Sequence, residues 1–209
     1  MSYAIINSAV RLVITPGSVV TSTCDAIVNA ANTGCLGGGA VDGAISHAGG
    51  PLLLEARKAI PIVPNPHNSR TKSCRCPTGE ARLTIGGSLK AKYVIHAVGP
   101  NYAVIRGLGM SEEKGDKLLA LTYKNTMLQA RTRSDEIKSI AFSLISAGVF
   151  RGGKTLNEVL EIGVRNVVEN VYEGLEEVQF VGYRASEISA LGEVLGVLVD
   201  KGLVERIEE

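Results

Sequence analysis

Two uninterrupted apolar runs place the strongest constraint on the fold of this chain. YVIHAV occupies residues 93–98 and ends at a Gly-Pro pair, and IAFSLI occupies residues 140–145 and leads into a glycine-containing loop. A strand with one face in water alternates apolar and polar residues, whereas a strand covered on both faces is apolar throughout. The two runs therefore predict buried parallel strands in a sheet that carries helices on both faces.

The remainder of the chain alternates between strand and helix patterns. Further strands are expected at residues 11–15, 26–29, 81–85 and 178–181, and helices are expected from residue 41 with a restart at Pro51, and over 118–128, 156–167 and 188–199. Such alternation is typical of α/β domains with a mainly parallel sheet. The length of 209 residues suits one domain, residues 1–209.

Two segments fall outside this alternation. Residues 61–78 contain four prolines and few residues of the buried type, so we expect an exposed loop there. The charged C-terminal residues, 203–209, are expected to fray or to end the last helix.

Composition and charge exclude several classes of protein. Lys and Arg total 22 and Asp and Glu total 21, and the net charge of +1 predicts no strong nucleic-acid binding through a positive field. The four cysteines and three histidines show no metal-ligand spacing, so we expect free thiols, no metal and a reducing compartment. Because no apolar run reaches the ~20 residues that span a bilayer, we expect an intracellular protein, cytoplasmic or nuclear, with no membrane partner.

Two glycine-rich loops follow predicted strands and lead into predicted helices. The first loop, residues 32–39, ends in a triple glycine, and the second loop, residues 146–153, reads SAGVFRGG. The first N–H groups of a helix have no partner within the helix and bind anions readily. Ligands of open α/β sheets bind outside the carboxyl ends of the strands. We therefore expect the loops to hold a diphosphate; the alternative is that the glycines only form turns.

Polar side chains around the first loop are candidates for the chemistry. Asp42 lies in the first turn of the following helix, where it either stabilises the helix N-terminus or acts as the base that activates water. Asn29 and Asn32 either form turns or hold ligand hydroxyl groups with their amides. Asp25, at the start of a predicted strand, could accept a hydrogen bond from the exocyclic amine of a base.

The second loop also allows a different interpretation. GVFRGGKT, residues 148–155, fits the pattern G-x-x-x-x-G-K-[ST] of P-loop nucleotide triphosphatases and lies between a predicted strand and a predicted helix. The next strand, VQFV, does not end in an aspartate for a metal ion, and this interpretation gives the first loop no role. A P-loop ATPase or GTPase is therefore the less favoured alternative.

Taken together, these motifs resemble a known family. NAAN, GGG, VDGAI, KYVIHAVGP and SAGVF occur in this order, and the combination is similar to the macro domain, the ADP-ribose-binding module. The VDG is similar to the MacroD-type branch, whose members remove ADP-ribose from modified carboxylates and deacetylate O-acetyl-ADP-ribose. The resemblance implies a three-layer α/β/α sandwich with a mixed, mostly parallel sheet, and an ADP-ribose cleft at the strand ends that needs no cofactor or metal.

The resemblance also implies roles for individual residues. Asp25 and the backbone of Ala26 would contact the adenine, and Tyr183 would lie against it. Asn32 would hold the distal ribose and, with Asp42, would orient the catalytic water. The other ADP-ribose contacts would come from Asn29 and from Gly37, Gly38, Gly39, Ala40, Val41, Ser146, Ala147, Gly148, Val149, Phe150 and Arg151.

The implied function is hydrolysis of ADP-ribose derivatives by Asp42-assisted attack of water. The substrates would be ADP-ribose on protein carboxylates, O-acetyl-ADP-ribose or ADP-ribose-1''-phosphate, and Arg151 could clamp a phosphate. MacroD-type enzymes usually carry a histidine four residues after the aspartate; here Ser46 occupies that position and His47 follows it. A reader that binds ADP-ribose or mono-ADP-ribosylated proteins without turnover is the alternative function.

Overall fold

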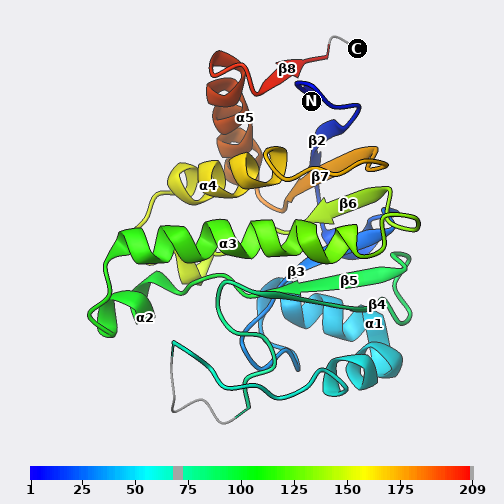
Figure 1. Ribbon diagram of the computed structural model, residues 1–209, viewed down its shortest axis with the longest axis vertical. Coiled ribbons are helices and arrows are strands. Elements are labelled where there is room, and N and C mark those ends of the chain that lie inside the picture. The colour runs from blue at the N-terminus through cyan, green and yellow to red at the C-terminus, as the bar shows by residue number, and fades with distance from the viewer. Residues whose placement is uncertain (68–72, 208–209) are drawn as a thin grey trace.

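The computed structural model describes residues 1–67 and 73–207, which form one eight-stranded sheet flanked by helices (Figure 1). The strands are β1 (Ser2–Ile5), β2 (Arg11–Pro16), β3 (Ala26–Ala30), β4 (Ala81–Ile85), β5 (Tyr93–Ala97), β6 (Ser139–Phe142), β7 (Glu177–Gly182) and β8 (Val204–Arg206). The helices are α1 (Ala40–Lys58), α2 (Tyr102–Gly107), α3 (Glu112–Arg131), α4 (Leu156–Val168) and α5 (Ala185–Asp200), with short 3-10 helices η1 (Val19–Thr21) and η2 (Val149–Arg151). Each strand and helix expected from the sequence overlaps one of these elements.

The sheet is mixed and mostly parallel, as predicted. Its strand order is β4-β5-β3-β6-β7-β2-β1-β8. β2, β7, β6, β3 and β5 are joined by parallel pairings, and β4, β1 and β8 are added antiparallel at the two sides. Because parallel strands share one direction, β2, β3, β5, β6 and β7 all end at the same edge of the sheet. We call it the carboxyl edge.

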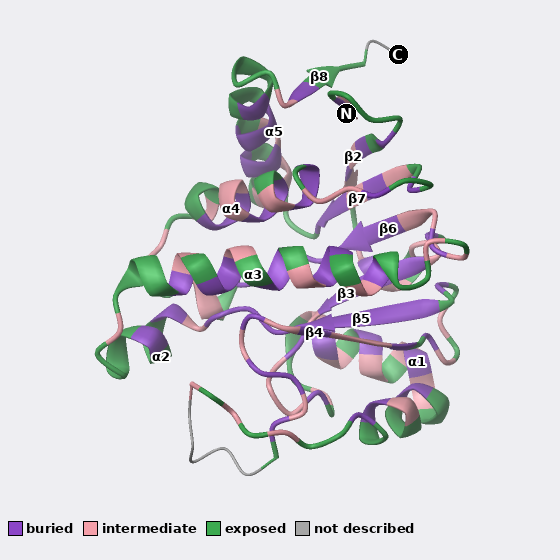
Figure 2. Cartoon of the chain, viewed as in Figure 1, coloured by how far each residue is buried: buried purple, intermediate pink, exposed green. Residues whose placement is uncertain are grey.

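Two hydrophobic clusters show that helices cover both faces of the sheet. The larger cluster joins Leu119 of α3 and Leu160 of α4 to Val28 of β3, and it also includes α5 side chains. The smaller cluster joins Ile45 of α1 to Ile27 of β3. Adjacent residues of a strand point to opposite faces, so β3 is buried between two helical layers (Figure 2). This is the α/β/α sandwich that the sequence motifs implied.

Helix α1 is interrupted at Gly50, whose φ of 65° and ψ of −161° are not helical. Pro51 then begins a second segment, as expected from the tolerance of proline at a first helical position. The interruption packs against the turn between β4 and β5, where Ser88 N–H donates to the carbonyl of Gly49 over 3.0 Å. Gly87 comes so close that a side-chain carbon there would lie 2.2 Å from the same carbonyl oxygen. The second segment of α1 thus leaves the direction of the first.

As far as residue 207, the C-terminal segment departs from the prediction of a frayed end or the end of the last helix. Residues 204–206 form β8, which pairs antiparallel with β1 and places Tyr3 opposite Arg206. Charged residues are common on edge strands, because one side of such a strand faces water. The short apolar segment of β1, which was not predicted, provides the partner.

The segment at residues 61–78 is exposed only in part. Most of residues 61–67 are partly or fully exposed, but Cys74, Cys76 and Pro77 are buried. The N–H group of Cys76 donates to the carbonyl of Thr33 over 3.1 Å. The second half of the segment therefore supports the first loop instead of lying in solvent; residues 68–72 lie outside the described residues.

Candidate functional site

The side chain of Asn32 holds the first loop at the carboxyl edge. Its Oδ1 atom accepts from the N–H of Gly34 over 3.0 Å, and its Nδ2 atom donates to the carbonyl of Gly37 over 2.9 Å. Gly37 has a φ of 121°, a conformation that favours glycine. The loop ends at Gly39, the N-cap of α1. Asn32 thus fixes the path of the triple glycine toward Asp42.

Backbone strain is concentrated in the two loops. Four of the described non-glycine residues have a positive φ, and three of them are Cys35 at 55°, Ala40 at 49° and Ser146 at 57°. Such conformations cost of order 1–3 kcal/mol each and persist only where the surroundings hold them. The Ser146 hydroxyl is held by donating to the carbonyl of Pro100 over 2.8 Å. Strain that is maintained in this way is typical of ligand-binding loops.

Asp42 is buried beneath the first loop, in the first turn of α1 where the sequence placed it. Its Oδ1 atom accepts from Nη2 of Arg57 over 2.6 Å and from Nδ2 of Asn29 over 2.9 Å. Its Oδ2 atom has no hydrogen-bond partner in the described part of the chain. A side-chain carbon at Gly38 would lie 2.9 Å from Oδ2, so the unpartnered oxygen lies directly against the triple glycine.

Arg57 reaches Asp42 because α1 is interrupted at Gly50. The two residues are 15 positions apart, which in an unbroken helix would separate them by about 22 Å along the axis. The guanidinium group is 1% exposed, and it also donates to Oγ of Ser46 over 2.6 Å and to the carbonyl of Cys35 in the first loop. A buried charge requires an opposite charge and hydrogen-bond partners. Arg57, which the sequence interpretation missed, supplies both to Asp42.

A second network reaches Asp42 through Asn29. His96 on β5 lies opposite Asn29 on β3; its Nδ1 atom is 3.1 Å from Nδ2 of Asn29, and its Nε2 atom is 2.9 Å from Oγ1 of Thr84. Burial, and then the charge of Arg57, lowers the pKa of His96 to about 3. A neutral ring with its hydrogen on Nε2 accepts one Asn29 amide hydrogen at Nδ1, and the other remains for Asp42.

Asn29 therefore orients the Asp42 carboxylate. It is fully buried, and its Oδ1 atom has no hydrogen-bond partner in the described part of the chain, so the direct contact of Asn29 with ADP-ribose stays a prediction. The alternation of side chains along β3 accounts for this arrangement, because residues 27 and 29 of a strand share one face and Ile27 packs against α1. His96 is a core histidine.

The second loop lies at the same edge and is held mainly by backbone and hydroxyl contacts. Gly99, after β5, comes so close that a side-chain carbon there would lie 2.3 Å from Oγ of Ser146. The base of the loop is buried at Ala147, whereas Val149 in η2 is 90% exposed. Phe150 and Asn32 line one cavity, so the structure brings the two predicted loops together.

Lys154 and Thr155 are occupied in ways that do not suit a P-loop. Nζ of Lys154 pairs with Asp116 over 2.9 Å and lies over the ring of Tyr102. Thr155 is the N-cap of α4, where its hydroxyl oxygen accepts from the N–H of Glu158 over 3.2 Å. These are the groups that a P-loop directs at phosphate and magnesium. The structure therefore gives no support to the interpretation as a P-loop ATPase or GTPase.

Asp25 and Ala26 do not reach the carboxyl edge, which corrects the expectation that they contact the ligand. They lie at the amino end of β3, and the loops follow the carboxyl ends of the strands. Oδ2 of Asp25 accepts from the N–H of Lys138 and from the N–H and hydroxyl of Ser139, at 2.8 to 2.9 Å. Asp25 thus joins the starts of β3 and β6 and has a structural role.

Tyr183 lies at the carboxyl edge, where it follows β7 directly and is 79% exposed. Pro16 of β2 pairs with Gly182 of β7, and the N–H of Gly17 donates to the carbonyl of Gly182 over 2.9 Å, so the turn that follows β2 lies at the same edge as Tyr183. The sequence interpretation did not include this turn, residues 17–18, in the site. The sequence feature that could have indicated this turn is Pro16-Gly17, which ends β2, a strand parallel to β7.

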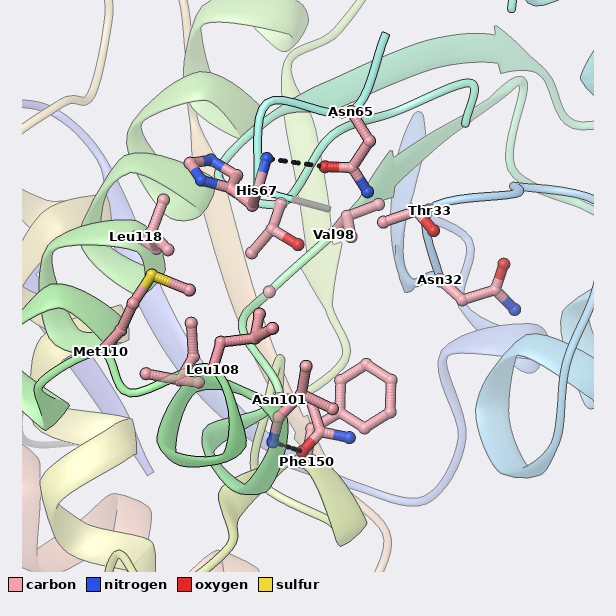
Figure 3. A pocket seen from close by; sticks show the side chains of 14 residues that line it. Asn32, Thr33, Asn65, His67, Val98, Asn101, Leu108, Met110, Leu118 and Phe150 are labelled. Atoms are coloured by element: carbon pink, nitrogen blue, oxygen red, sulfur yellow. Dashed lines mark hydrogen bonds between the residues drawn. The ribbon is translucent and has the colours of Figure 1, made fainter. Parts of the chain in front are cut away.

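A cavity of about 200 Å³ opens between the two loops and α2 (Figure 3). Asn32 and Phe150 contribute to its wall, and Leu108, Met110 and Leu118 lie on the side away from Asn32. Its other apolar lining residues are Val98, Val104 and Ile105. No lysine, arginine, aspartate or glutamate from residues 1–67 or 73–207 lines this cavity.

Metal ligands do not converge anywhere in the described residues: no group of three or more His, Cys, Asp and Glu side chains could hold an ion. All four cysteines are free, as predicted, and buried. Cys35 and Cys76 pack with Val98 below the first loop. In the same part of the chain, no helix is long and apolar enough to cross a membrane.

Comparison with known proteins identifies the family. The family model "Macro domain" matches residues 28–162. An O-acetyl-ADP-ribose deacetylase of Salmonella newport is 42% identical over 175 residues, which cover 83% of this chain and 87% of that protein. The solved structure of the Oceanobacillus iheyensis macrodomain with ADP has a TM-score of 0.76 at 30% identity and covers 96% of this chain and 97% of that one. The Trypanosoma brucei macrodomain in complex with ADP-ribose has a TM-score of 0.70 at 30% identity, with 93% and 75% covered. The chain belongs to the macro domain family.

Proposed function

We propose that this chain, acting as a single domain, binds ADP-ribose at the carboxyl edge and hydrolyses ADP-ribose derivatives there. Two kinds of relative support the proposal: a similar protein is named O-acetyl-ADP-ribose deacetylase, and a similar structure holds ADP-ribose. O-Acetyl-ADP-ribose and mono-ADP-ribosylated proteins are the substrates to consider first.

The ligand is proposed to lie across both loops. The N–H groups of residues 37–41 and 146–151 would surround the diphosphate, with Arg151 at the exposed rim, because free backbone N–H groups at loop and helix starts bind anions. Asn32 would hold the distal ribose. Tyr183, with Ser18 of the turn at the same edge, is proposed to contact the adenine, and Asp25 is left out because it lies at the opposite end of β3.

The catalytic proposal is carried by one observation: the two carboxylate oxygens of Asp42 differ in their hydrogen-bond partners. Arg57 and Asn29 hold Oδ1, whereas Oδ2 is buried, unpartnered and directed at the triple glycine. A general base must offer a free oxygen within hydrogen-bond reach of the water that it deprotonates. We assign this role to Oδ2, and we assign to Arg57 and Asn29 the positioning of the carboxylate.

Ser46 extends the same arrangement. It occupies the position where MacroD-type enzymes usually carry a histidine, and here its hydroxyl oxygen accepts a hydrogen bond from Arg57 over 2.6 Å. Ser46 is thus part of the support for Asp42 and is not a second base. His47, one position along the helix, is exposed and takes no part in this proposal.

The test is turnover by the wild-type protein. O-Acetyl-ADP-ribose and a mono-ADP-ribosylated protein are incubated separately with the chain, and free ADP-ribose is measured by chromatography. Calorimetric titration with ADP-ribose gives the affinity in parallel. Release of ADP-ribose from either substrate supports the proposal. Tight binding of ADP-ribose with no release from either substrate would instead identify a reader.

A further inference from the structure

The cavity in Figure 3 begins where the proposed ribose site ends. Asn32, proposed to hold the distal ribose, and Phe150 of the second loop both contribute to its wall. A group that is attached to this ribose and directed away from the diphosphate would enter the cavity. The cavity therefore lies in the correct place to receive the group that hydrolysis removes.

The cavity is lined by apolar residues and by the polar residues Asn32, Thr33, Asn65, His67, Thr78 and Asn101. Its apolar part favours an uncharged, apolar group. Val104 and Leu108, 48% and 49% exposed, present apolar surface to water, and Met110 and the buried Leu118 also line the cavity. A phosphate or carboxylate in this place would lose hydration without meeting a lysine or arginine, because none of the described residues supplies one to the wall. An alkyl chain would replace water on both surfaces, which is favourable.

The size of the cavity favours a group larger than acetyl. Its volume is about 200 Å³, and an apolar cavity of about 150 Å³ in another protein accommodates benzene. By that comparison the present cavity holds a chain of about four to six carbons. An acetyl group would leave most of the apolar wall uncovered.

We infer that this chain prefers O-acyl-ADP-ribose esters whose acyl chain has about four to six carbons. The inference rests on the proposed hydrolase function and adds a substrate class to it. In each turnover a water oxygen bonds to the acyl carbon, and the bond from that carbon to the ribose oxygen breaks. The ribose oxygen leaves with a proton, so the products are ADP-ribose and a free carboxylic acid.

The experiment compares kcat/KM for the acetyl, butyryl, hexanoyl and decanoyl esters of ADP-ribose. For the wild-type protein we expect kcat/KM to rise about tenfold from acetyl to butyryl, because added methylenes in an apolar pocket discriminate by at least this factor. We expect little further gain to hexanoyl and a fall at decanoyl, which exceeds the cavity. ADP-ribose-1''-phosphate is expected to be the poorest substrate.

A pair of variants assigns the preference to the cavity. Val104→Phe in α2 fills part of the space, and Val197→Phe is the matched control because Val197 is also exposed, on α5. We expect Val104→Phe to lower the ratio of kcat/KM for hexanoyl over acetyl to about one and Val197→Phe to keep the wild-type ratio. Thermal unfolding checks that both variants fold.

Three results would overturn the inference. Equal or falling kcat/KM from acetyl to hexanoyl in the wild type would contradict it while leaving the hydrolase proposal intact. If Val104→Phe kept the wild-type ratio of kcat/KM for hexanoyl over acetyl, the acyl chain would lie outside this cavity. Failure to hydrolyse any ester, with ADP-ribose still bound, would contradict the inference, and it would contradict the proposed function as well only if no ADP-ribose were released from the mono-ADP-ribosylated protein.

Discussion

The two glycine-rich loops occupy the same edge of the sheet but rest on different supports. Beneath the first loop lies a buried ion pair, Asp42 with Arg57, to which Asn29 is hydrogen-bonded. Beneath the second loop lie a hydroxyl-to-carbonyl hydrogen bond from Ser146 and close glycine contacts. Lys154, which directly follows the loop, pairs with Asp116.

This difference indicates a division of labour. Chemistry requires an atom held within narrow limits, and a buried charged network restricts its members to one arrangement because every alternative leaves a charge unpaired. Binding a phosphate through backbone N–H groups requires only the path of the chain. We therefore expect changes beneath the first loop to affect both stability and turnover, and comparable changes at the second loop to have small effects.

The largest effect on stability is expected for Arg57→Met. It leaves the Asp42 carboxylate buried and unpaired, and breaking one partner of a buried pair typically costs about 3–5 kcal/mol. Lys58→Met is the control, since it removes a positive charge from the adjacent, exposed position. Urea unfolding measures both variants. If Arg57→Met were as stable as Lys58→Met, the ion pair would not support the first loop.

The second-largest effect is expected when one methyl group is added to a glycine of the first loop, and the same change in the second loop is the comparison. In Gly38→Ala the new carbon would lie 2.9 Å from Oδ2 of Asp42, which cannot move freely because its other oxygen is held, whereas Gly148 has open space around it. Overpacking of this kind costs about 1–3 kcal/mol. We expect Gly38→Ala to lower stability by this amount and to lower kcat, with Gly148→Ala near wild type. Similar effects of the two variants would remove the contrast.

The His96 network gives the first loop a pH dependence. Because burial lowers the pKa of His96 to about 3 in the folded chain, while an unfolded histidine has a pKa of about 6.5, the unfolded chain binds the extra proton between these values. The contribution of His96 to the free energy of unfolding is thus fully present above pH ~6.5. It is lost as the pH falls toward ~3, by up to about 1.4 kcal/mol per pH unit.

Urea unfolding from pH 7 to pH 4 tests this expectation. The loss of stability should be shallower in His96→Gln than in the wild type, because the titrating group is gone. His47→Gln is the control, since the His47 ring is exposed. A pH profile of His96→Gln that parallels the wild type would show that His96 is not held neutral in the fold.

The smallest effect is expected for Lys154→Met. The Lys154 side chain is 10% exposed and that of Asp116 is 31% exposed, so the substitution leaves a carboxylate that water can still reach. ADP-ribose affinity, measured by calorimetry, should change less than about twofold, because no part of the proposed ligand contact passes through this lysine. A loss of more than about tenfold would bring Lys154 into the phosphate site and revive the P-loop comparison.

Sequence patterns were sufficient for the layers of the fold and for the two loops. The apolar runs 93–98 and 140–145 identified buried strands, and the glycine clusters identified where the chain leaves regular structure. Asp25 was assigned to the adenine from the family resemblance and from its place at the start of a predicted strand. Asp25 lies before β3 and the first loop lies after it, so the two are at opposite ends of the strand.

Local sequence patterns could not predict which residues hold Asp42 in place. Arg57 follows Asp42 by 15 residues, and their contact depends on the change of direction at Gly50 and its packing against Gly87. Asn29 shows the same limit on a smaller scale. Its type suggested a ligand contact, whereas its place against His96 follows from the register of β3 with β5.

The most direct test of the central claim is the separation of binding from turnover in Asp42→Asn. The substitution keeps the shape of the side chain and removes the negative charge. We predict ADP-ribose affinity by calorimetry within about fivefold of wild type, and a kcat for the preferred ester lowered by about 10²- to 10⁴-fold, the usual contribution of a general base. Circular dichroism confirms that the variant is folded. A folded Asp42→Asn protein that keeps wild-type kcat would contradict the account.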